Sequence, residues 1–189
     1  MSNVLVYPNA FSVEECQRII RERLEVNTTP AYSPGMQVDP EIRSSMVNFL
    51  YADCVDGTGC EWIFDRLWEL SREHPLGAIV EKLPFIQFAE YDSHYAGHFK
   101  PHRDTENFYH ATDKKNFTRK LTIVINLSDP SSYSGGDVKL YDVVVNDDPL
   151  IGQRDRGCAI MFPSNTLHEV TKVTAGIRYS LSAWFEARI

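Results

Sequence analysis

Two histidines and one aspartate, His102, Asp104 and His168, are the residues of this chain whose types and order suit a catalytic metal. Two imidazoles and one carboxylate can occupy one face of a non-haem Fe(II) ion and leave the other face open for a co-substrate and O2. Zn²⁺ also accepts this donor set. Arg178 follows ten residues after the second histidine, and its planar guanidinium suits a bidentate interaction with a carboxylate. Together the four residues favour an oxygenase, whereas each one alone predicts little.

Strand geometry decides whether these side chains can meet. Residues i and i+2 of a strand point to the same side, so His102 and Asp104 can bind one ion from a single strand end. His168 comes shortly after an expected strand, and Arg178 returns on the next one. We therefore expect His168 and Arg178 on neighbouring antiparallel strands, with Ser180 on the same strand face as Arg178.

The N-terminal part of the chain has helical periodicity. Ser12-Val13-Glu14-Glu15 has the form of a capping box, which predicts a helix of about a dozen residues. A second helix is expected over Glu61–Glu73, where large apolar residues recur at helical spacing. Prolines and a glycine predict a loop over Thr28–Pro40, between the two helices.

From residue 84 the hydrophobic pattern changes to that of strands separated by turns. The expected strands are Phe85–Tyr91, Lys120–Leu127, Asp137–Asp142, Cys158–Phe162 and Ile177–Phe185. The expected turns are Asp129-Pro130, Ser134-Gly135-Gly136, Asp147-Asp148-Pro149 and Thr174-Ala175-Gly176. Helices followed by many short strands predict the α+β class, with the β half as a sandwich or jelly roll. We expect one domain over residues 1–189, with 1–83 mainly helical support and substrate loops and 84–189 the jelly-roll core.

Composition and charge exclude several classes of protein. Of the 189 residues, 43% are hydrophobic and 12% aromatic, which is enough for a sizeable core and argues against disorder. A formal net charge of −7 argues against a nucleic-acid backbone or an anionic membrane as the main partner. The sequence has no basic N-terminal stretch and no apolar run long enough for a membrane span, so we expect a cytoplasmic protein. Its cysteines form no CxxC pair and are expected to be reduced and mostly buried: Cys16, Cys54, Cys60 and Cys158.

Four motifs follow one another in a specific order and spacing. They are Phe99-Lys100-Pro101-His102-Arg103-Asp104-Thr105-Glu106, Tyr133-Ser134-Gly135-Gly136-Asp137, Phe162-Pro163 before His168, and Arg178. With this order the segment 85–185 resembles the 2-oxoglutarate- and Fe(II)-dependent dioxygenases, most closely their prolyl 4-hydroxylase branch. Phe11–Cys16 and Arg43-Ser44-Ser45 add weaker similarity. The resemblance implies a double-stranded β-helix, the jelly-roll or cupin-like fold, with N-terminal helices packed on its outside.

The resemblance also assigns roles to individual residues. It implies His102, Asp104 and His168 as the ligands of Fe(II). Arg178 is implied to bind the C5 carboxylate of 2-oxoglutarate, and Ser180 is a lesser candidate for the same co-substrate. The aspartate ligand favours hydroxylation, because related halogenases replace it with a small residue.

A tyrosine upstream of the first iron ligand often contacts 2-oxoglutarate in the family. Tyr91 is the residue that we choose for this role. The family spacing of tyrosine, glycine and histidine is not kept here, so Tyr95 stays an alternative.

The implied reaction is 2-oxoglutarate- and O2-dependent hydroxylation of an unactivated C–H bond, with succinate and CO2 as co-products and ascorbate as a further candidate cofactor. The branch favours a prolyl or other amino-acid side chain in a protein or peptide. Thr28–Pro40 and Thr105–Thr118 are candidate loops to close over this substrate, and Arg43 is a candidate contact. Trp184 stands where nucleic-acid demethylases of the superfamily have a further arginine, which argues against a nucleic-acid substrate.

Two alternatives remain open at the level of sequence. In the first alternative, the substrate is a free amino acid or a small metabolite instead of a protein or peptide. A non-catalytic metal-binding jelly roll would also use two histidines and an aspartate, but it would not need Arg178. The oligomeric state is not predicted.

Overall fold

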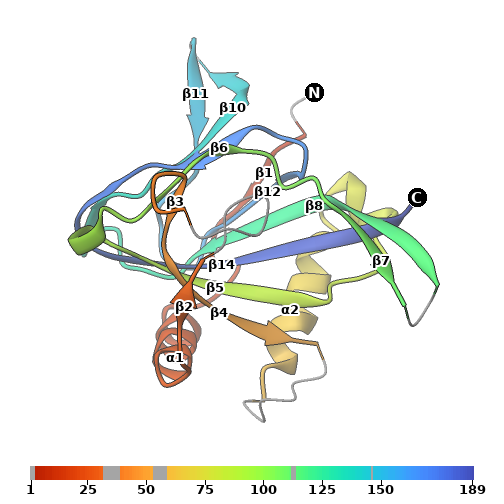
Figure 1. Cartoon of the computed structure of the whole chain (residues 1–189), viewed down its shortest axis with the longest axis horizontal. Coiled ribbons are helices and arrows are strands. Elements are labelled where there is room, and N and C mark those ends of the chain that lie inside the picture. The colour runs from red at the N-terminus through yellow and green to blue at the C-terminus, as the bar shows by residue number, and fades with distance from the viewer. Residues whose placement is uncertain (1–2, 32–38, 53–58, 112–113, 146) are drawn as a thin grey trace.

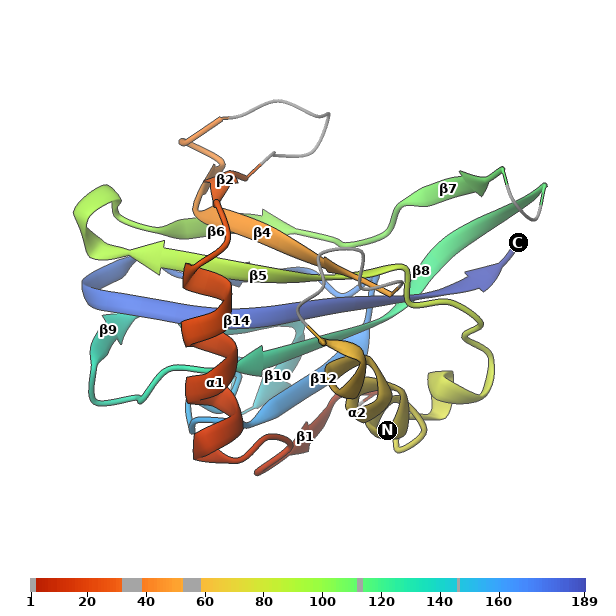
Figure 2. The same ribbon diagram turned by 90° about the horizontal axis from the view of Figure 1, so that it is seen from below.

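The structure is a computed structural model that describes residues 3–31, 39–52, 59–111, 114–145 and 147–189. In these residues two β-sheets face each other, and two α-helices cover the outer face of the larger sheet (Figures 1 and 2). The expected α+β jelly-roll class is therefore confirmed. Neither of the described α-helices combines the length and apolar character that a membrane span requires.

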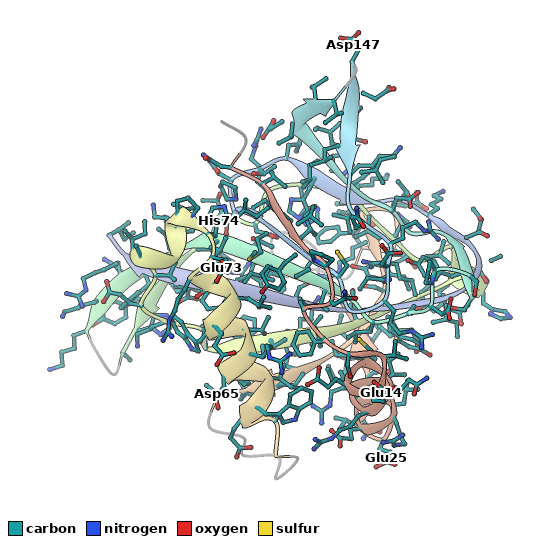
Figure 3. All side chains as sticks on the ribbon, turned by 180° about the vertical axis from the view of Figure 1, so that it is seen from behind. Glu14, Glu25, Asp65, Glu73, His74 and Asp147 are labelled. Carbon is teal, nitrogen blue, oxygen red and sulfur yellow. The ribbon has the colours of Figure 1, made fainter. Side chains whose placement is uncertain are left out.

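Helix α1 (Val13–Leu24) begins at the capping box that the sequence predicts. The Glu15 backbone N–H donates to Oγ of Ser12 at 3.1 Å, and the Ser12 backbone N–H donates to the Glu15 carboxylate at 2.7 Å. Helix α2 (Glu61–Ser71) ends two residues before the expected position. Figure 3 shows both helices in front of the larger sheet. Two short 3-10 helices are η1 (Pro75–Ala78) and η2 (Ser93–Tyr95).

The larger sheet contains nine strands in the part of the chain that the structure describes. Its main path has the order β1-β12-β8-β14-β5-β4-β2, while β7 pairs with β8 and β9 pairs with β14. The strands are β1 (Leu5–Tyr7), β2 (Thr29–Pro30), β4 (Met46–Tyr51), β5 (Phe85–Asp92), β7 (Asn107–His110), β8 (Lys115–Asn126), β9 (Tyr133–Gly135), β12 (Ala159–Pro163) and β14 (Val173–Arg188).

The smaller sheet contains five strands among the described residues, in the order β11-β10-β13-β6-β3. The strands are β3 (Arg43–Ser44), β6 (His98–His102), β10 (Val138–Val145), β11 (Asp148–Ile151) and β13 (His168–Val170). The β10–β11 hairpin projects away from the body of the molecule, and Asp147 marks its outer end (Figure 3). All strand pairs in both sheets are antiparallel.

Alternate side chains of β14 point into two different buried regions, because successive residues of a strand point to opposite faces. One set is apolar and is buried in the core between the larger sheet and the helices: Leu181, Ala183 and Phe185. The other set lines a pocket between the two sheets: Arg178, Ser180, Ser182 and Trp184. The neighbouring strand β5 alternates in the same way, with Ile86 and Phe88 towards the helices and Gln87 and Tyr91 towards the pocket.

Several expected boundaries are wrong. The candidate loop Thr105–Thr118 contains β7 and the beginning of β8, which pair as a hairpin. Its asparagines and lysines have low β-propensity, so cross-strand pairing outweighs the local signal. The expected turn Thr174–Gly176 lies within β14, where it pairs with β9. In the expected loop Thr28–Pro40, two residues form β2, and residues 32–38 lie outside the described part.

The first 83 residues contribute strands as well as helices. Strands β1, β2 and β4 extend the larger sheet, and β3 forms an edge of the smaller one. We expected mainly helical support and substrate loops over residues 1–83. Strands β1, β2 and β3 have only two or three residues, and β1, β3 and β4 pair with strands that begin at Phe85 or later, so the local pattern does not reveal them.

Candidate metal centre

The two histidine rings and the aspartate meet between the sheets. His102 is the last residue of β6 and pairs in register with His168, the first residue of β13. Asp104 lies two residues beyond β6, where its backbone N–H donates to the carbonyl of Ser164 at 2.8 Å. Nε2 of His102 lies 3.5 Å from Oδ1 of Asp104, and Nε2 of His168 lies 3.4 Å from Oδ2. The donor atoms all lie within 4.8 Å of one another, so one ion can contact all three side chains.

Backbone carbonyls fix the tautomer of both histidines. Nδ1 of His102 lies 2.8 Å from the carbonyl oxygen of Lys100, and Nδ1 of His168 lies 2.9 Å from that of Thr166. A carbonyl oxygen can only accept, so each Nδ1 must carry the proton. In the neutral rings Nε2 then keeps its lone pair, and it points towards the Asp104 carboxylate. This arrangement orients histidines in metal sites.

The charge states of the site suit a divalent cation. Burial opposes ionisation of Asp104, but interactions with His168 and His102 outweigh it and hold the pKa of Asp104 below its usual range. Burial lowers the pKa of His168 and outweighs the opposite effect of Asp104. At neutral pH the site therefore presents an ionised carboxylate and a neutral buried imidazole, the forms that bind metal.

Two hydroxyl groups, linked to each other by a hydrogen bond, support the aspartate. Oγ1 of Thr122, a fully buried residue on β8, donates to Oδ2 of Asp104 at 2.9 Å. Oγ of Ser164 lies 3.0 Å from the same Thr122 oxygen. Thr122 has one hydroxyl proton and uses it on Asp104, so Ser164 donates to Thr122. Sequence reasoning missed both residues, although the inward-facing positions of a core strand next to a ligand would have indicated Thr122.

Arg103 lies between the two ligands in sequence and points away from them. Its guanidinium contacts the carboxylate of Asp142 at 2.5 Å and donates to the carbonyl of Asn165. Asp142 also accepts from the backbone N–H of Leu167, the residue before His168. These contacts tie the segment of the first two ligands to the segment of the third.

Arg178 is a buried cation without a carboxylate partner among the described residues. Its side chain lines the same pocket as the three candidate ligands, and the residue is 3% exposed. Nη1 donates to Oγ of Ser180 at 3.3 Å, and Cζ lies 5.7 Å from the ring centroid of Tyr91. A buried guanidinium that lacks a counter-ion fits an anionic ligand, because isolation of such a charge is costly. Arg178 and Ser180 share one strand face, as expected. The expectation that His168 and Arg178 lie on neighbouring antiparallel strands is wrong, because His168 is on β13 of the smaller sheet and Arg178 is on β14 of the larger one.

The two candidate tyrosines lie in different places. Tyr91 is buried, pairs in register with Arg178 and lines the pocket. Tyr95 is 36% exposed, and its single hydroxyl proton is shared between the backbone carbonyl of Glu90 at 3.1 Å and the Glu90 carboxylate at 3.2 Å. Only Tyr91 is therefore placed to contact a ligand beside Arg178.

The remaining pocket walls come from both sheets. Gln87, Ser182 and Trp184 contribute from the larger sheet, and Phe99 and Arg43 from the smaller one. Apolar valines complete the lining: Val124, Val138 and Val170. The alternation of polar and apolar residues along β5 and β14 was the signal that could have identified Gln87 and Ser182.

Known proteins share both the sequence pattern and the fold. A family model described as the 2OG-Fe(II) oxygenase superfamily matches residues 86–186, which is more than half of the chain. A PKHD-type hydroxylase from Shewanella sp. (strain ANA-3) is 25% identical over 182 residues, which cover 96% of this chain and 77% of the relative. The PKHD-type hydroxylase YbiX from Escherichia coli O1:K1 / APEC is 38% identical over 73 residues, 36% of this chain and 29% of the relative.

Solved structures of two prolyl hydroxylases have a similar fold. The Trichoplax adhaerens prolyl hydroxylase, in complex with a peptide fragment of the hypoxia inducible factor oxygen degradation domain, gives a TM-score of 0.76 at 15% identity. The similarity covers 98% of this chain and 84% of that one. A Pseudomonas putida prolyl-4-hydroxylase gives a TM-score of 0.71 at 17% identity and covers 98% and 93% of the two chains. These neighbours confirm the double-stranded β-helix as the fold.

Proposed function

The chain belongs to the 2OG-Fe(II) oxygenase superfamily, and we propose that it hydroxylates an unactivated C–H bond of an amino-acid side chain. As a member it is an Fe(II)- and 2-oxoglutarate-dependent dioxygenase, and Fe(II) and 2-oxoglutarate are its cofactor and co-substrate. The proposed target is a prolyl side chain in a protein or peptide, with succinate and CO2 as co-products.

We assign the metal to His102, Asp104 and His168. Their two imidazole Nε2 atoms and one carboxylate form a donor set that fits Fe(II). Arg178 is assigned to the C5 carboxylate of 2-oxoglutarate, supported by Ser180. When bound, the iron and 2-oxoglutarate supply the oxidising power; the protein positions the target carbon and excludes water from it.

Tyr91 completes the proposed co-substrate site. Its ring lies beside the guanidinium of Arg178, and the two residues pair in register on adjacent strands. A hydroxyl in this position can donate to the carboxylate that Arg178 holds.

One observation carries this assignment: the buried guanidinium of Arg178, which has no counter-ion among the described residues, lines the same pocket as the three converging ligands. A protein that only binds metal gains nothing from such a residue, because an unpaired buried cation destabilises the fold. A site that must also hold a dicarboxylate does need it. This favours the oxygenase over a non-catalytic metal-binding jelly roll.

The proposed substrate class is supported by relatives rather than by the pocket. A structural neighbour is a prolyl hydroxylase in complex with a peptide fragment, and another is a prolyl-4-hydroxylase. Free amino acids and small metabolites are the alternative substrates. Because Trp184 and not an arginine occupies the position six residues beyond Arg178, nucleic acid is not proposed as a substrate.

An anaerobic titration tests the proposed function. Protein with Fe(II) and 2-oxoglutarate should develop a visible charge-transfer band. Arg178→Ala should abolish this band at 2-oxoglutarate concentrations that saturate the wild type, because it removes the counter-ion of the C5 carboxylate. The matched control is Arg188→Ala at the far end of the same strand, where the exposed guanidinium pairs with Glu81 at 2.7 Å.

Turnover is measured next. After admission of O2, with ascorbate present, succinate should form and a +16 Da product should appear in prolyl peptides or amino acids. A well-folded protein that shows no band, or an Arg178→Ala variant with a wild-type band, would contradict the assignment.

A further inference from the structure

A second buried arginine, Arg43, lines the same pocket from the opposite sheet. It lies on β3 and is 8% exposed. Three partly shielded arginines have carboxylates within 3.1 Å: Arg119 with Glu106, Arg154 with Asp137 and Arg156 with Asp129. Arg43 has no carboxylate at ion-pair distance in the described part of the chain.

The guanidinium of Arg43 has one hydrogen bond and one ring contact among the described residues. Nε donates to Oγ of Ser45 at 3.0 Å, and Cζ lies 4.5 Å over the ring of Phe99. Nη1 and Nη2 have no hydrogen-bond acceptor in the described residues. Four N–H groups in a planar fork therefore remain for a ligand in the pocket, and they match the two oxygens of a carboxylate.

The free fork lies close to the metal centre. The ring of Phe99 stacks on the imidazole of His102 with centroids 3.5 Å apart and an interplanar angle of 16°. Since 4.5 Å separates Cζ of Arg43 from the Phe99 centroid, Cζ lies no more than 8 Å from the His102 centroid. A small molecule can thus reach from the guanidinium of Arg43 to the neighbourhood of the metal.

We propose that Arg43 binds a carboxylate of the primary substrate. The oxidised residue then has a free α-carboxylate, as a free amino acid or the C-terminal residue of a peptide does. This inference rests on the proposed function, in which the C5 carboxylate of 2-oxoglutarate occupies Arg178. A residue inside a polypeptide offers only neutral carbonyls to Arg43. The buried positive charge would then remain without a counter-ion, which is the costly arrangement.

The inference is tested by measuring how matched pairs of ligands bind. The protein is first loaded with Fe(II) and saturating 2-oxoglutarate under anaerobic conditions. The probes are free L-amino acids, including proline, each with its amide, and glycyl dipeptides, each with its C-terminal amide. By isothermal titration calorimetry, at least one carboxylate should bind about tenfold or more tightly than its amide, as expected for a hydrogen-bonded ion pair. The kind of pair that binds, amino acid or dipeptide, identifies the source of the carboxylate.

Variants connect this preference to the arginine. Arg43→Gln should remove the tenfold preference, and Arg43→Lys should retain part of it because the charge remains. Arg21→Gln, which replaces an exposed arginine of α1, is the control and should bind like the wild type. Circular dichroism of each variant checks the fold, and the lysine variant decides the question if the glutamine variant is unfolded.

Three results would overturn the inference: no carboxylate binds more tightly than its amide, no probe binds at all, or Arg43→Gln keeps the preference. The charge-transfer band, recorded before each titration, separates this failure from a failure of the proposed function. A normal band with no carboxylate preference refutes only the role of Arg43. Absence of the band refutes the assigned function, and the inference that rests on it fails too.

Discussion

Thr122→Val isolates the hydrogen bond that supports the aspartate of the candidate metal centre. Valine has nearly the shape of threonine but no hydroxyl group, so Oδ2 of Asp104 loses its 2.9 Å donor and Oγ of Ser164 loses its acceptor. Because Thr122 is fully buried, water cannot replace the lost donor without rearrangement. We expect the carboxylate to lose its fixed orientation towards the two imidazoles.

The magnitude follows from the kind of hydrogen bond involved. A hydrogen bond to a charged group contributes about 1.5–3 kcal/mol, which corresponds to roughly a 10- to 100-fold change in a binding constant. Loss of a residue that supports a metal ligand has effects of the same order. We therefore expect the Kd for Fe(II) to rise about 10- to 100-fold. The free energy of unfolding of the iron-free protein should fall by about 1–3 kcal/mol.

The assay is an anaerobic Fe(II) titration with saturating 2-oxoglutarate, followed through the charge-transfer band, and urea denaturation reports stability. The control is Thr118→Val on the same strand, where a buried hydroxyl donates to the backbone carbonyl of Glu106 at 3.2 Å. This variant should lose stability but bind Fe(II) like the wild type. An unchanged Fe(II) affinity in Thr122→Val, or an equal loss in Thr118→Val, would refute the reasoning.

Three further predictions concern the neighbouring groups. In Gly136→Ala the new Cβ would lie 2.9 Å from Cδ of Arg178, at a φ of +66°, so the Kd for 2-oxoglutarate should rise about tenfold; an unchanged value in calorimetry would contradict this. The folded-state pKa of His168 is lowered, so the unfolded chain binds more protons, and the wild-type stability of iron-free protein should fall as pH drops below about 6.5. The urea-derived stability difference between wild type and His168→Gln should therefore shrink from pH 7.5 to 5.5, and a constant difference would count against it. Burial raises the pKa of Cys16 to about 12 and that of Cys158 to about 11, so peptide mapping after iodoacetamide treatment at pH 8 should find both unlabelled in folded protein; rapid labelling of either would contradict their burial.

The sequence predicted those features that depend on local chemistry. The capping box at Ser12 fixes the start of α1, because both of its hydrogen bonds form within four residues. The fold class could also be predicted, because helical periodicity dominates the N-terminal part of the sequence and strand periodicity the rest. The resemblance indicated that His102, Asp104 and His168 meet, but the pairing of the two histidines on β6 and β13 was not predicted.

The features that the sequence did not reveal depend on long-range pairing. Strand β3, which carries Arg43, has two residues and exists because it pairs with β6, more than fifty positions away. Spacing alone left Tyr91 and Tyr95 as rivals, and only the register between β5 and β14 separates them. Thr122 is recognisable as a support of Asp104 only once the inward face of β8 is known. No local pattern encodes such contacts.

The two-sided character of β14 limits how this protein can change. Seven residues of the strand pair with β5 and nine with β8, so its register is fixed from both neighbours. Loss or gain of a single residue between Arg178 and Leu181 would turn the residues on one side of the change to the opposite face, so that either Leu181 would face the ligand pocket or Arg178 would face the apolar core. Point substitutions at 178, 180, 182 and 184 can therefore reshape chemistry while the helices stay anchored. Insertions and deletions here would abolish folding and catalysis in one step.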